Sequence, residues 1–362
     1  MEKMVNESYL RSIYAGKRVF LTGHTGFKGT WMLQILHWLG AEVKGYSLAP
    51  EKEIDLYNLI NGDQFCQSSV IADIIDRERL AGEMVGFNPD FVFHFAAQAL
   101  VRRGYEKPSY TFLVNAQGTA HVLDAMRLLN GTCIGIMITT DKVYDNPERG
   151  LPFSEEDKLG GYDPYSASKA AAEIVIDSYR RSFFNPAKYE THSKCIAAAR
   201  AGNVIGGGDS SDDRIVPDIV RAITAGDTVT LRNPKSIRPW QHVLEPLAGY
   251  LVLAAKTTED HTKHSTAYNL GPDPDDMLTV EELTKVFIES YGHGSYKAII
   301  DDQAPHEAKL LLLNSRKAEE HLGWTSKLDA RTAIQWTASW HAESGRSARD
   351  KCMEQIKKYF NE

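Results

Sequence analysis

A glycine-spaced loop between an apolar run and a helical pattern constrains the fold of this chain more than any other feature. Residues 19–22 (VFLT) are typical of a buried strand, and residues 22–29 (TGHTGFKG) place three glycines in a GxxGxxG spacing. Apolar side chains then recur at helical spacing over residues 30–39. Glycines at such a turn let backbone amides approach a pyrophosphate at the positive end of the helix. Because ordinary strand-to-helix turns also contain glycines, the interpretation depends on the surrounding strand–helix–strand pattern.

Strands and helices alternate through the first half of the chain. We expect further strands and helices in six segments, namely strands at 42–46, 91–95, 134–139 and 195–200 and helices at 115–129 and 166–182. This alternation predicts βαβ units and therefore an α/β fold with a Rossmann-type parallel sheet.

The alternation of strand and helix patterns is weaker in the second half of the chain. After about Phe183 the segments are shorter and richer in proline, glycine and asparagine, which indicates a smaller mixed α/β lobe that binds the substrate. The expected dinucleotide-binding domain spans residues 15–190 together with about 236–265. The expected substrate lobe spans about 191–235 and 266–345.

Composition excludes several classes of partner. The 362 residues carry a formal net charge of −7, so no protein-wide positive field attracts nucleic acid or anionic lipid. No apolar run approaches the ~18 residues of a membrane span, and residues 1–17 lack the apolar segment of a secretion signal. The four cysteines show neither metal-ligand nor disulfide spacing. We therefore expect a cytoplasmic protein without a metal site, a membrane attachment or a nucleic-acid partner.

The loop and the ends of the next strands supply the candidate dinucleotide-binding residues. In the loop these are Gly23, Thr25, Gly26, Phe27, Lys28 and Gly29. An acidic residue after the second strand would favour NAD by accepting hydrogen bonds from the ribose, but Ser47 stands there with no arginine beside it. We expect NAD and leave NADP open. Asp73, with Ile74 beside it, is a candidate for the adenine edge, or alternatively a turn residue.

The single YxxxK pattern, Tyr165 to Lys169, is a candidate oxidation centre. Asp163 and a following proline predict a helix start, so Tyr165 and Lys169 lie one turn apart. A lysine ammonium near a phenol lowers the pKa of that phenol, which can then remove an alcohol proton while hydride leaves to a nicotinamide. Thr139 and Thr140 end the preceding strand and can bind the same alcohol. The alternative is a solvated helix start with a surface lysine.

Together these motifs resemble the extended short-chain dehydrogenase/reductase family over most of the chain. The resemblance also includes FAAQ at residues 95–98 and RAGNVIG at 200–206. It implies that Ala96, Ala97 and Gln98 lie on the dinucleotide. It also implies that Asn115 is the structural active-site asparagine of the family, which we place among the substrate-binding residues, and that Asn203 contacts the substrate.

The segment that follows Thr140 resembles one branch of the family. Nucleotide-sugar 4,6-dehydratases carry an Asp-Glu pair at this point, and the Asp141-Lys142 pair here is similar to the branch that acts on CDP-glucose. Longer local matches support this resemblance, at residues 22–31, 160–169, 200–209 and 233–246. The resemblance implies a hydro-lyase that converts CDP-glucose to CDP-4-keto-6-deoxyglucose for surface polysaccharide such as O-antigen. It also implies a homodimer formed by helix pairing.

Dehydration gives both residues of the pair a role. Oxidation at C4 makes the C5 proton acidic, a base removes that proton, an acid protonates the C6 hydroxyl, and hydride returns to C6. We expect Asp141 to be the general acid and Lys142 the base, which requires a transiently neutral lysine. Alternatively a charged Lys142 stabilises the enolate, or the two residues form a solvated pair.

A basic segment at residues 232–242 (RNPKSIRPWQH) is the candidate nucleotide clamp in this acidic protein. By resemblance, Arg232 and Arg238 bind the diphosphate or nucleoside, with His242 and Arg102 nearby. An exposed loop with ordinary charges is the alternative. One departure from the family is Ser210, which follows GGGD where the family has tryptophan.

Three other functions fit part of this pattern. A nucleotide-sugar epimerase needs only the threonine, tyrosine and lysine. A 4,6-dehydratase acting on another nucleotide base needs a different clamp. A non-catalytic NAD(P)-binding regulator needs only the glycine loop, and the intact Thr140, Tyr165 and Lys169 argue against it.

Overall fold

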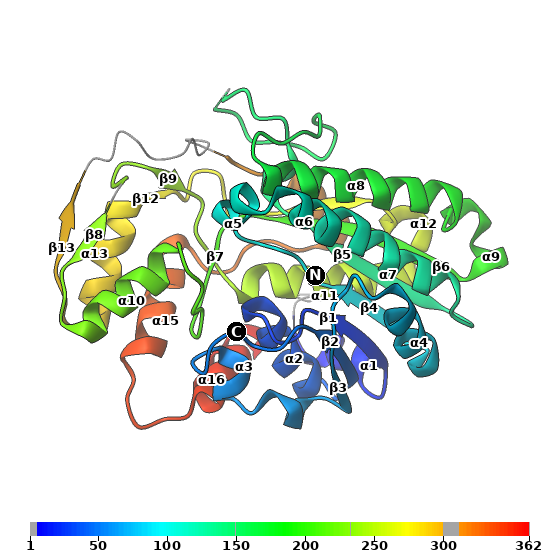
Figure 1. Ribbon diagram of the computed structural model, residues 1–362, viewed down its shortest axis with the longest axis horizontal. Coiled ribbons are helices and arrows are strands. Elements are labelled where there is room, and N and C mark those ends of the chain that lie inside the picture. The colour runs from blue at the N-terminus through cyan, green and yellow to red at the C-terminus, as the bar shows by residue number, and fades with distance from the viewer. Residues whose placement is uncertain (1–5, 149, 232, 300–310, 362) are drawn as a thin grey trace.

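Seven parallel strands form the central sheet of the computed structural model, which describes residues 6–148, 150–231, 233–299 and 311–361 (Figure 1). Every neighbouring pair in this sheet is parallel. In sheet order the strands are β11 (Ala267–Leu270), β6 (Lys194–Ala201), β5 (Cys133–Ile138), β4 (Phe91–His94), β1 (Arg18–Thr22), β2 (Glu42–Ser47) and β3 (Ser68–Ile71). The predicted Rossmann-type parallel sheet is confirmed.

Helices cover both faces of this sheet. One face packs against α1 (Glu7–Tyr14), α2 (Phe27–Trp38), α11 (Leu244–Glu259), α14 (Arg316–Leu322) and α16 (Ala348–Asn361). The other packs against α4 (Arg77–Phe87), α7 (Gly118–Arg127) and α8 (Pro164–Ser182). Short helices connect these layers, namely α3 (Leu56–Leu59), α5 (Val101–Glu106), α6 (Pro108–Phe112), α9 (Tyr189–His192) and α12 (His261–His264).

The apolar runs of the strands follow from this two-sided cover. Successive side chains of a strand point to opposite faces, so Val19 and Leu21 enter one core while Phe20 enters the other. A strand that is buried on both faces is apolar at most positions, which is why residues 19–21 form a continuous apolar run.

A smaller lobe lies beside the sheet, at the left of Figure 1. Its own apolar core joins three helices and several short strands. The elements of this lobe are α10 (Ile215–Ala225), α13 (Val280–Tyr291), α15 (Ala330–Ala342), β8 (Val229–Leu231), β9 (Ile237–Arg238), β12 (Leu278–Thr279) and β13 (Tyr296–Ala298). Two further strands, β7 (Val204–Ile205) and β10 (Gln241–His242), pair with each other between the lobe and α11.

The predicted domain boundaries need one correction. The sequence pattern assigns about 191–235 and 266–345 to the smaller lobe. However, β6 pairs with β5 and β11 pairs with β6 as members of the central sheet. Both strands therefore belong to the larger layer, in which β11 is the edge strand and β6 lies between β11 and β5.

The carboxyl ends of the parallel strands meet at one edge of the sheet, where α/β proteins of this type bind their ligands. The glycine loop follows β1, residues 95–98 follow β4, and residues 139–144 follow β5. Helix α8 begins beside them, with Pro164 at its first position and the Asp163 carboxylate accepting a hydrogen bond from the Ser166 backbone N–H at 3.0 Å. The topology therefore brings the predicted cofactor and catalytic residues to the same edge.

Candidate active site

The glycine loop is built so that no side chain fills it. Gly23 has a φ of +74°, and a Cβ there would lie 2.7 Å from the Ala96 backbone nitrogen. A Cβ on Gly29 would lie 2.0 Å from the Gly23 carbonyl oxygen. Gly26 caps α2 without a side chain and is exposed. The N-terminus of α2 therefore keeps an open backbone cradle, which fits a dinucleotide pyrophosphate.

Polar contacts hold the ends of β2 and β3 beside this loop. The Thr25 hydroxyl donates to the Leu48 carbonyl and lies 2.8 Å from the Ser47 hydroxyl. The Asp73 carboxylate accepts a hydrogen bond from the Ile75 backbone N–H, which is the turn geometry of an aspartate after a strand. Ile74 is buried against the position of Gly118 in α7. Ser47 therefore lies beside the glycine loop at the end of β2, and Asp73 and Ile74 follow the end of β3.

The segment after β5 carries the predicted acid and base in one short 3-10 turn, Asp141–Val143. The Thr140 hydroxyl donates to Asp141 Oδ1 at 2.9 Å and accepts from the Lys142 backbone N–H at 3.4 Å. Asp141 is 3% exposed, and this burial raises the pKa of its carboxyl group, against the lowering charges of Lys142 and Lys28. The raised pKa favours a protonated carboxyl group, which is the form that a general acid needs.

Tyr165 and Lys169 lie one helical turn apart on α8, as their spacing predicts, and this helix packs against the Asp141–Val143 turn. Burial raises the pKa of the Tyr165 phenol to about 12, although a hydrogen bond with the Thr140 hydroxyl lowers it. Lys169 Nζ donates to the Ile138 carbonyl of β5 at 3.0 Å, and burial lowers the pKa of this lysine to about 8. The expected lowering of the phenol pKa by Lys169 is not what this structure has, because burial dominates at both residues.

Lys28 of the glycine loop also interacts electrostatically with the catalytic residues Asp141 and Lys169. Its ammonium donates to the Tyr250 hydroxyl of α11 at 3.5 Å. Burial lowers the pKa of Lys28 to about 7, the positive charges of Arg214 and Lys169 lower it further, and the Asp141 carboxylate raises it. The sequence does not single out Tyr250 and Arg214, because Tyr250 lies within an apolar helical run and Arg214 follows the acidic and polar residues 209–213 in a loop.

Asn115 and Gln98 have structural hydrogen bonds with each other. The Gln98 backbone N–H donates to Asn115 Oδ1 at 2.9 Å, and Asn115 Nδ2 donates to the Gln98 carbonyl and to the Ser168 hydroxyl of α8. Asn115 is 1% exposed and lies in a π-helical turn, Leu113–Gln117. Its amide therefore ties the loop after β4 to the helix that carries Tyr165, and we assign it a positioning role instead of the predicted substrate contact.

The remaining predicted cofactor residues follow β4. The Ala96 backbone N–H donates to the Thr22 hydroxyl at 3.1 Å, which places Ala96 against the glycine loop. Ala96 and Ala97 are partly exposed, whereas the Gln98 amide donates to the Thr111 hydroxyl and the Leu100 carbonyl.

The predicted substrate-binding residues differ from one another in exposure and in contacts. Asn203 and Arg238 are partly exposed, and the charge of Arg238 reaches Asp141. Arg102 is exposed and forms an ion pair with Asp213 at 2.7 Å. His242 is fully buried between Trp31 and Trp336, so we do not retain it as a substrate ligand. Arg232 lies outside the described residues.

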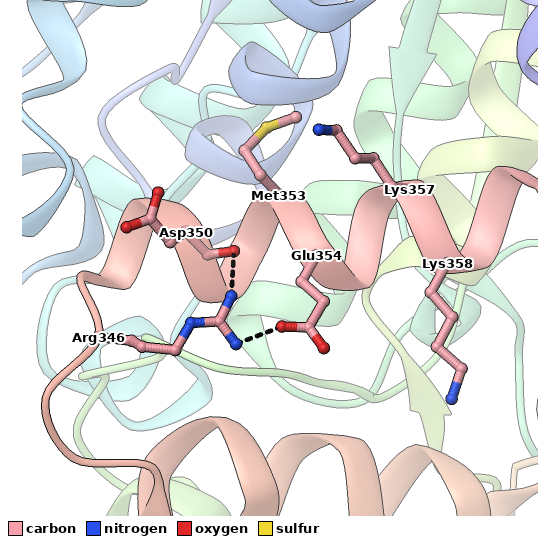
Figure 2. A pocket seen from close by; sticks show the side chains of 6 residues that line it. All are labelled: Arg346, Asp350, Met353, Glu354, Lys357 and Lys358. Carbon is pink, nitrogen blue, oxygen red and sulfur yellow. Dashed lines mark hydrogen bonds and ion pairs between the residues drawn. The ribbon is translucent and has the colours of Figure 1, made fainter.

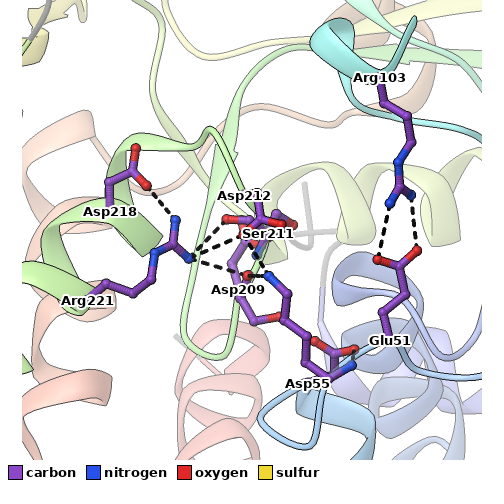
Figure 3. Close-up of polar contacts among 10 residues, drawn as sticks. Glu51, Asp55, Arg103, Asp209, Ser211, Asp212, Asp218 and Arg221 are labelled. Carbon is purple, nitrogen blue, oxygen red and sulfur yellow. Dashed lines mark hydrogen bonds and ion pairs between the residues drawn. The ribbon is translucent and has the colours of Figure 1, made fainter. Parts of the chain in front are cut away.

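Ion pairs join the loop after β2 to α5 and to the loop that precedes α10 (Figure 3). Arg103 binds Glu51, and Lys52 binds Asp212 at 2.7 Å. Ser210, at the position where the family has tryptophan, donates to the Asp55 carboxylate, and its carbonyl accepts from Lys52. Ser210 therefore forms a polar link between these two loops.

A separate surface hollow lies along the outer side of α16 (Figure 2). Its lining is Arg346, Asp350, Met353, Glu354, Lys357 and Lys358. Arg346 pairs there with Glu354 and with the Asp350 carbonyl. None of these residues belongs to the glycine loop or to the catalytic group, so the hollow is not the candidate active site.

The described residues contain no group of three or more histidine, cysteine or acidic side chains that could hold a metal ion. Within the same residues, no helix combines the length and apolarity that crossing a bilayer requires.

A dinucleotide-binding parallel sheet with a tyrosine–lysine pair and an acid–lysine turn defines a sugar-nucleotide-modifying enzyme of the short-chain dehydrogenase/reductase type. Residues 20–337 match the model of the GDP-mannose 4,6 dehydratase family, and the chain belongs to that family. It is 43% identical over 331 residues to CDP-glucose 4,6-dehydratase of Salmonella typhimurium, which covers 91% of this chain and 92% of that protein.

More distant relatives include both dehydratases and epimerases. Identity is 26% to dTDP-glucose 4,6-dehydratase of Streptomyces antibioticus, over 90% of this chain and 92% of that protein. Among solved structures, dTDP-glucose 4,6-dehydratase from Streptomyces venezuelae with NAD bound superposes with a TM-score of 0.75 at 24% identity, over 90% of this chain and 97% of that one. This structural likeness confirms the fold.

Proposed function

We propose that this enzyme converts CDP-glucose to CDP-4-keto-6-deoxyglucose and water. The observation that carries the proposal is the turn in which the Thr140 hydroxyl donates to Asp141, packed against α8, the helix that carries Tyr165 and Lys169. Thr140, the threonine of the oxidation centre, therefore directly precedes the acid–base pair Asp141-Lys142. The identity to the CDP-glucose enzyme of Salmonella typhimurium supports the choice of substrate.

The first role of the chain is to take a proton from the sugar. Tyr165 accepts the proton of the C4 hydroxyl, Thr140 orients that hydroxyl, and Lys169 holds a positive charge beside the cofactor position. Gly23, Gly26 and the N-terminus of α2 would hold NAD, which would supply a hydride acceptor for C4 and a hydride donor for C6. NADP stays a second possibility for the cofactor, since Ser47 carries no charge that rejects a 2′-phosphate.

The second role is the elimination of water. Asp141 donates a proton to the departing C6 hydroxyl, and its buried carboxyl group has the raised pKa that this role requires. Lys142, which is only partly buried, removes the C5 proton and later returns a proton to C5. No net oxidation results, because the hydride that leaves C4 is the one that arrives at C6.

The nucleotide is proposed to lie between the sheet edge and the smaller lobe. Arg238 and Asn203 approach it from that lobe, and Arg102 approaches it from α5. Arg232 is proposed to bind the diphosphate, as its resemblance to the family implies. Guanidinium groups suit this task because they bind phosphate oxygens with two hydrogen bonds.

We also propose a cytoplasmic homodimer. The partly or largely exposed apolar residues Phe112, Leu113 and Ile174 lie on α6, on the π-helical turn that follows it and on α8, which pack side by side. A second copy of the same helices would cover them. Four free cysteines, three of them buried, fit a reducing compartment.

Incubation with CDP-, dTDP-, GDP- and UDP-glucose tests this function. We expect the mass of one water to be lost from CDP-glucose and much less from the other three. A product of unchanged mass with inverted C4 would identify a 4-epimerase. Dehydration of a different nucleotide would keep the reaction and change the substrate, and tight cofactor binding without turnover would indicate a regulator.

A further inference from the structure

A buried ion pair joins the two halves of the candidate active site. Arg200 of β6 and Glu173 of α8 are each 4% exposed. Arg200 Nε donates to Glu173 Oε1 at 2.9 Å, and Arg200 Nη2 donates to Glu173 Oε2 at 3.0 Å. Two parallel hydrogen bonds fix the orientation of both planar groups, so this pair is a rigid point inside the protein.

The residues on either side of the acid–base turn both bind this pair. Thr139 donates to Glu173 Oε1 at 2.5 Å, so it does not face the substrate as its sequence position suggested. Arg200 Nη1 donates to the Tyr144 hydroxyl at 2.8 Å, and that hydroxyl donates to Asn269 Oδ1 at 2.6 Å. Residues 140–142 are therefore held between two anchors that end at one ion pair.

The same pair is attached to the oxidation centre through the helix. Glu173 follows Lys169 by one turn of α8, the helix that also carries Tyr165. We propose that Glu173 and Arg200 form a positioning unit, which holds the Asp141-Lys142 turn in register with Tyr165 and Lys169 so that one bound sugar meets both. This inference rests on the proposed function and adds two residues that touch neither sugar nor cofactor.

The charge of Glu173 supplies a readout that a purely structural role would not change. The Glu173 carboxylate raises the pKa of Lys169, which burial lowers to about 8. The other groups that face Lys169 are Lys28 of α2 and His94 of β4. Loss of the Glu173 charge therefore lowers the pKa of Lys169 further, and its ammonium form disappears at a lower pH.

The first experiment is Glu173→Gln in the full-length enzyme. The alkaline limb of the rate of cofactor reduction on CDP-glucose should shift to lower pH by about one unit or more, as expected when a buried charge loses a near partner. Glu83→Gln is the matched control. It removes a partly buried ion pair between Glu83 of α4 and Lys44 of β2, away from the candidate active site. The control should keep the pH profile of the unmodified enzyme.

The second experiment leaves the ion pair intact, because removing one partner of such a pair also destabilises the fold. Tyr144→Phe removes only the hydroxyl between Arg200 and Asn269 and keeps the ring, which stacks on Phe153. We expect kcat to fall by about tenfold to a hundredfold with little change in KM, as for a misplaced catalytic group. Reduced cofactor should accumulate during turnover, since water elimination slows more than oxidation does.

A third measurement does not depend on the substrate. Amide hydrogen exchange over residues 139–145 should accelerate in Tyr144→Phe and in Thr139→Val, and stay unchanged in Glu83→Gln. Unchanged exchange, together with unchanged pH profiles and no accumulation of reduced cofactor, would overturn the inference. If the unmodified enzyme dehydrates none of the four nucleotide sugars, the proposed function fails, and the exchange experiment still decides whether the ion pair holds the turn.

Discussion

Burial sets the charge of the residues around the candidate active site. It raises the pKa of Tyr165 to about 12 and of Asp141 above its usual range, and it lowers those of Lys169 and Lys28 to about 8 and about 7. Each group is thus shifted toward its neutral form. For Lys169 and Lys28 this shift brings the charged and neutral forms close in free energy near neutral pH, which suits groups that exchange protons during a reaction cycle. For Tyr165 it favours the protonated phenol over the phenolate.

Tyr165→Phe should stop the first step. Without the phenol no group accepts the C4 hydroxyl proton, so we expect cofactor reduction to slow by about a hundredfold to ten-thousandfold. The measurement is the near-ultraviolet absorbance of the reduced nicotinamide after mixing with CDP-glucose. Tyr179 lies further along α8, and its hydroxyl donates to Asp124 of α7. The control variant Tyr179→Phe should reduce the cofactor at the normal rate. Normal reduction by the Tyr165 variant would contradict the assignment.

Lys142→Ala should separate the two steps. Oxidation depends on Thr140, Tyr165 and Lys169, so partial cofactor reduction should persist while the release of water stops. Quenched-flow mass analysis of the sugar measures both. Lys158→Ala, which removes an exposed lysine paired with Asp145 at 2.8 Å, is the control. Equal losses in both steps would argue that Lys142 has a general structural role.

At the scale of elements, the backbone of the glycine loop and the N-terminus of α2 together form the candidate dinucleotide cradle. Gly29→Ala should damage it, because the new Cβ would lie 2.0 Å from the Gly23 carbonyl and the loop would have to move. We expect a loss of NAD affinity, measured by calorimetry, and a lower melting temperature. Gly82→Ala is the matched control, since nothing lies within 4 Å of its Cβ and alanine favours a helix interior by roughly 0.5–1 kcal/mol. Unchanged NAD binding by the Gly29 variant would mean that the loop does not hold the dinucleotide.

Local sequence patterns predict much of this fold, but they do not predict which segments pair over long distances in the sequence. The expected strands at 91–95 and 134–139 match β4 and β5 within one residue, because strands buried on both faces are apolar throughout. Strand β11 is only four residues long and lies in a proline- and glycine-rich region, so its place beside β6 has no local signal. The hydrogen bond between Tyr144 and Asn269 likewise joins residues 125 positions apart.

At the scale of the whole molecule, acid sensitivity should come from buried histidines. Burial lowers the pKa to about 4 for His24 and His341 and to about 3 for His94 and His242. The unfolded chain takes up these protons below about pH 6.5 while the folded chain does not. Each such histidine therefore leaves stability unaffected above about pH 6.5 and removes up to about 1.4 kcal/mol per pH unit below it. The raised pKa of Glu245, about 7, acts in the opposite direction.

His242→Gln isolates one of these contributions. Its side chain packs between two tryptophans, so the variant should be less stable at every pH. The stability lost between about pH 6.5 and about pH 5.5 should nevertheless be smaller than in the unmodified protein, by up to about 1.4 kcal/mol. Urea unfolding at the two pH values measures the difference. Equal losses in both proteins would mean that His242 takes up its proton in the folded state.

The most direct test of the chemistry follows one hydrogen through the reaction. CDP-glucose carrying deuterium at C4 is converted by the enzyme, and the product is examined by mass spectrometry and NMR. If C4 oxidation, water elimination and reduction occur at a single site, the product will have lost one water and will carry the deuterium at C6. Deuterium that stays at C4 of a product with unchanged mass, or that is lost to solvent while water is eliminated, would contradict this mechanism.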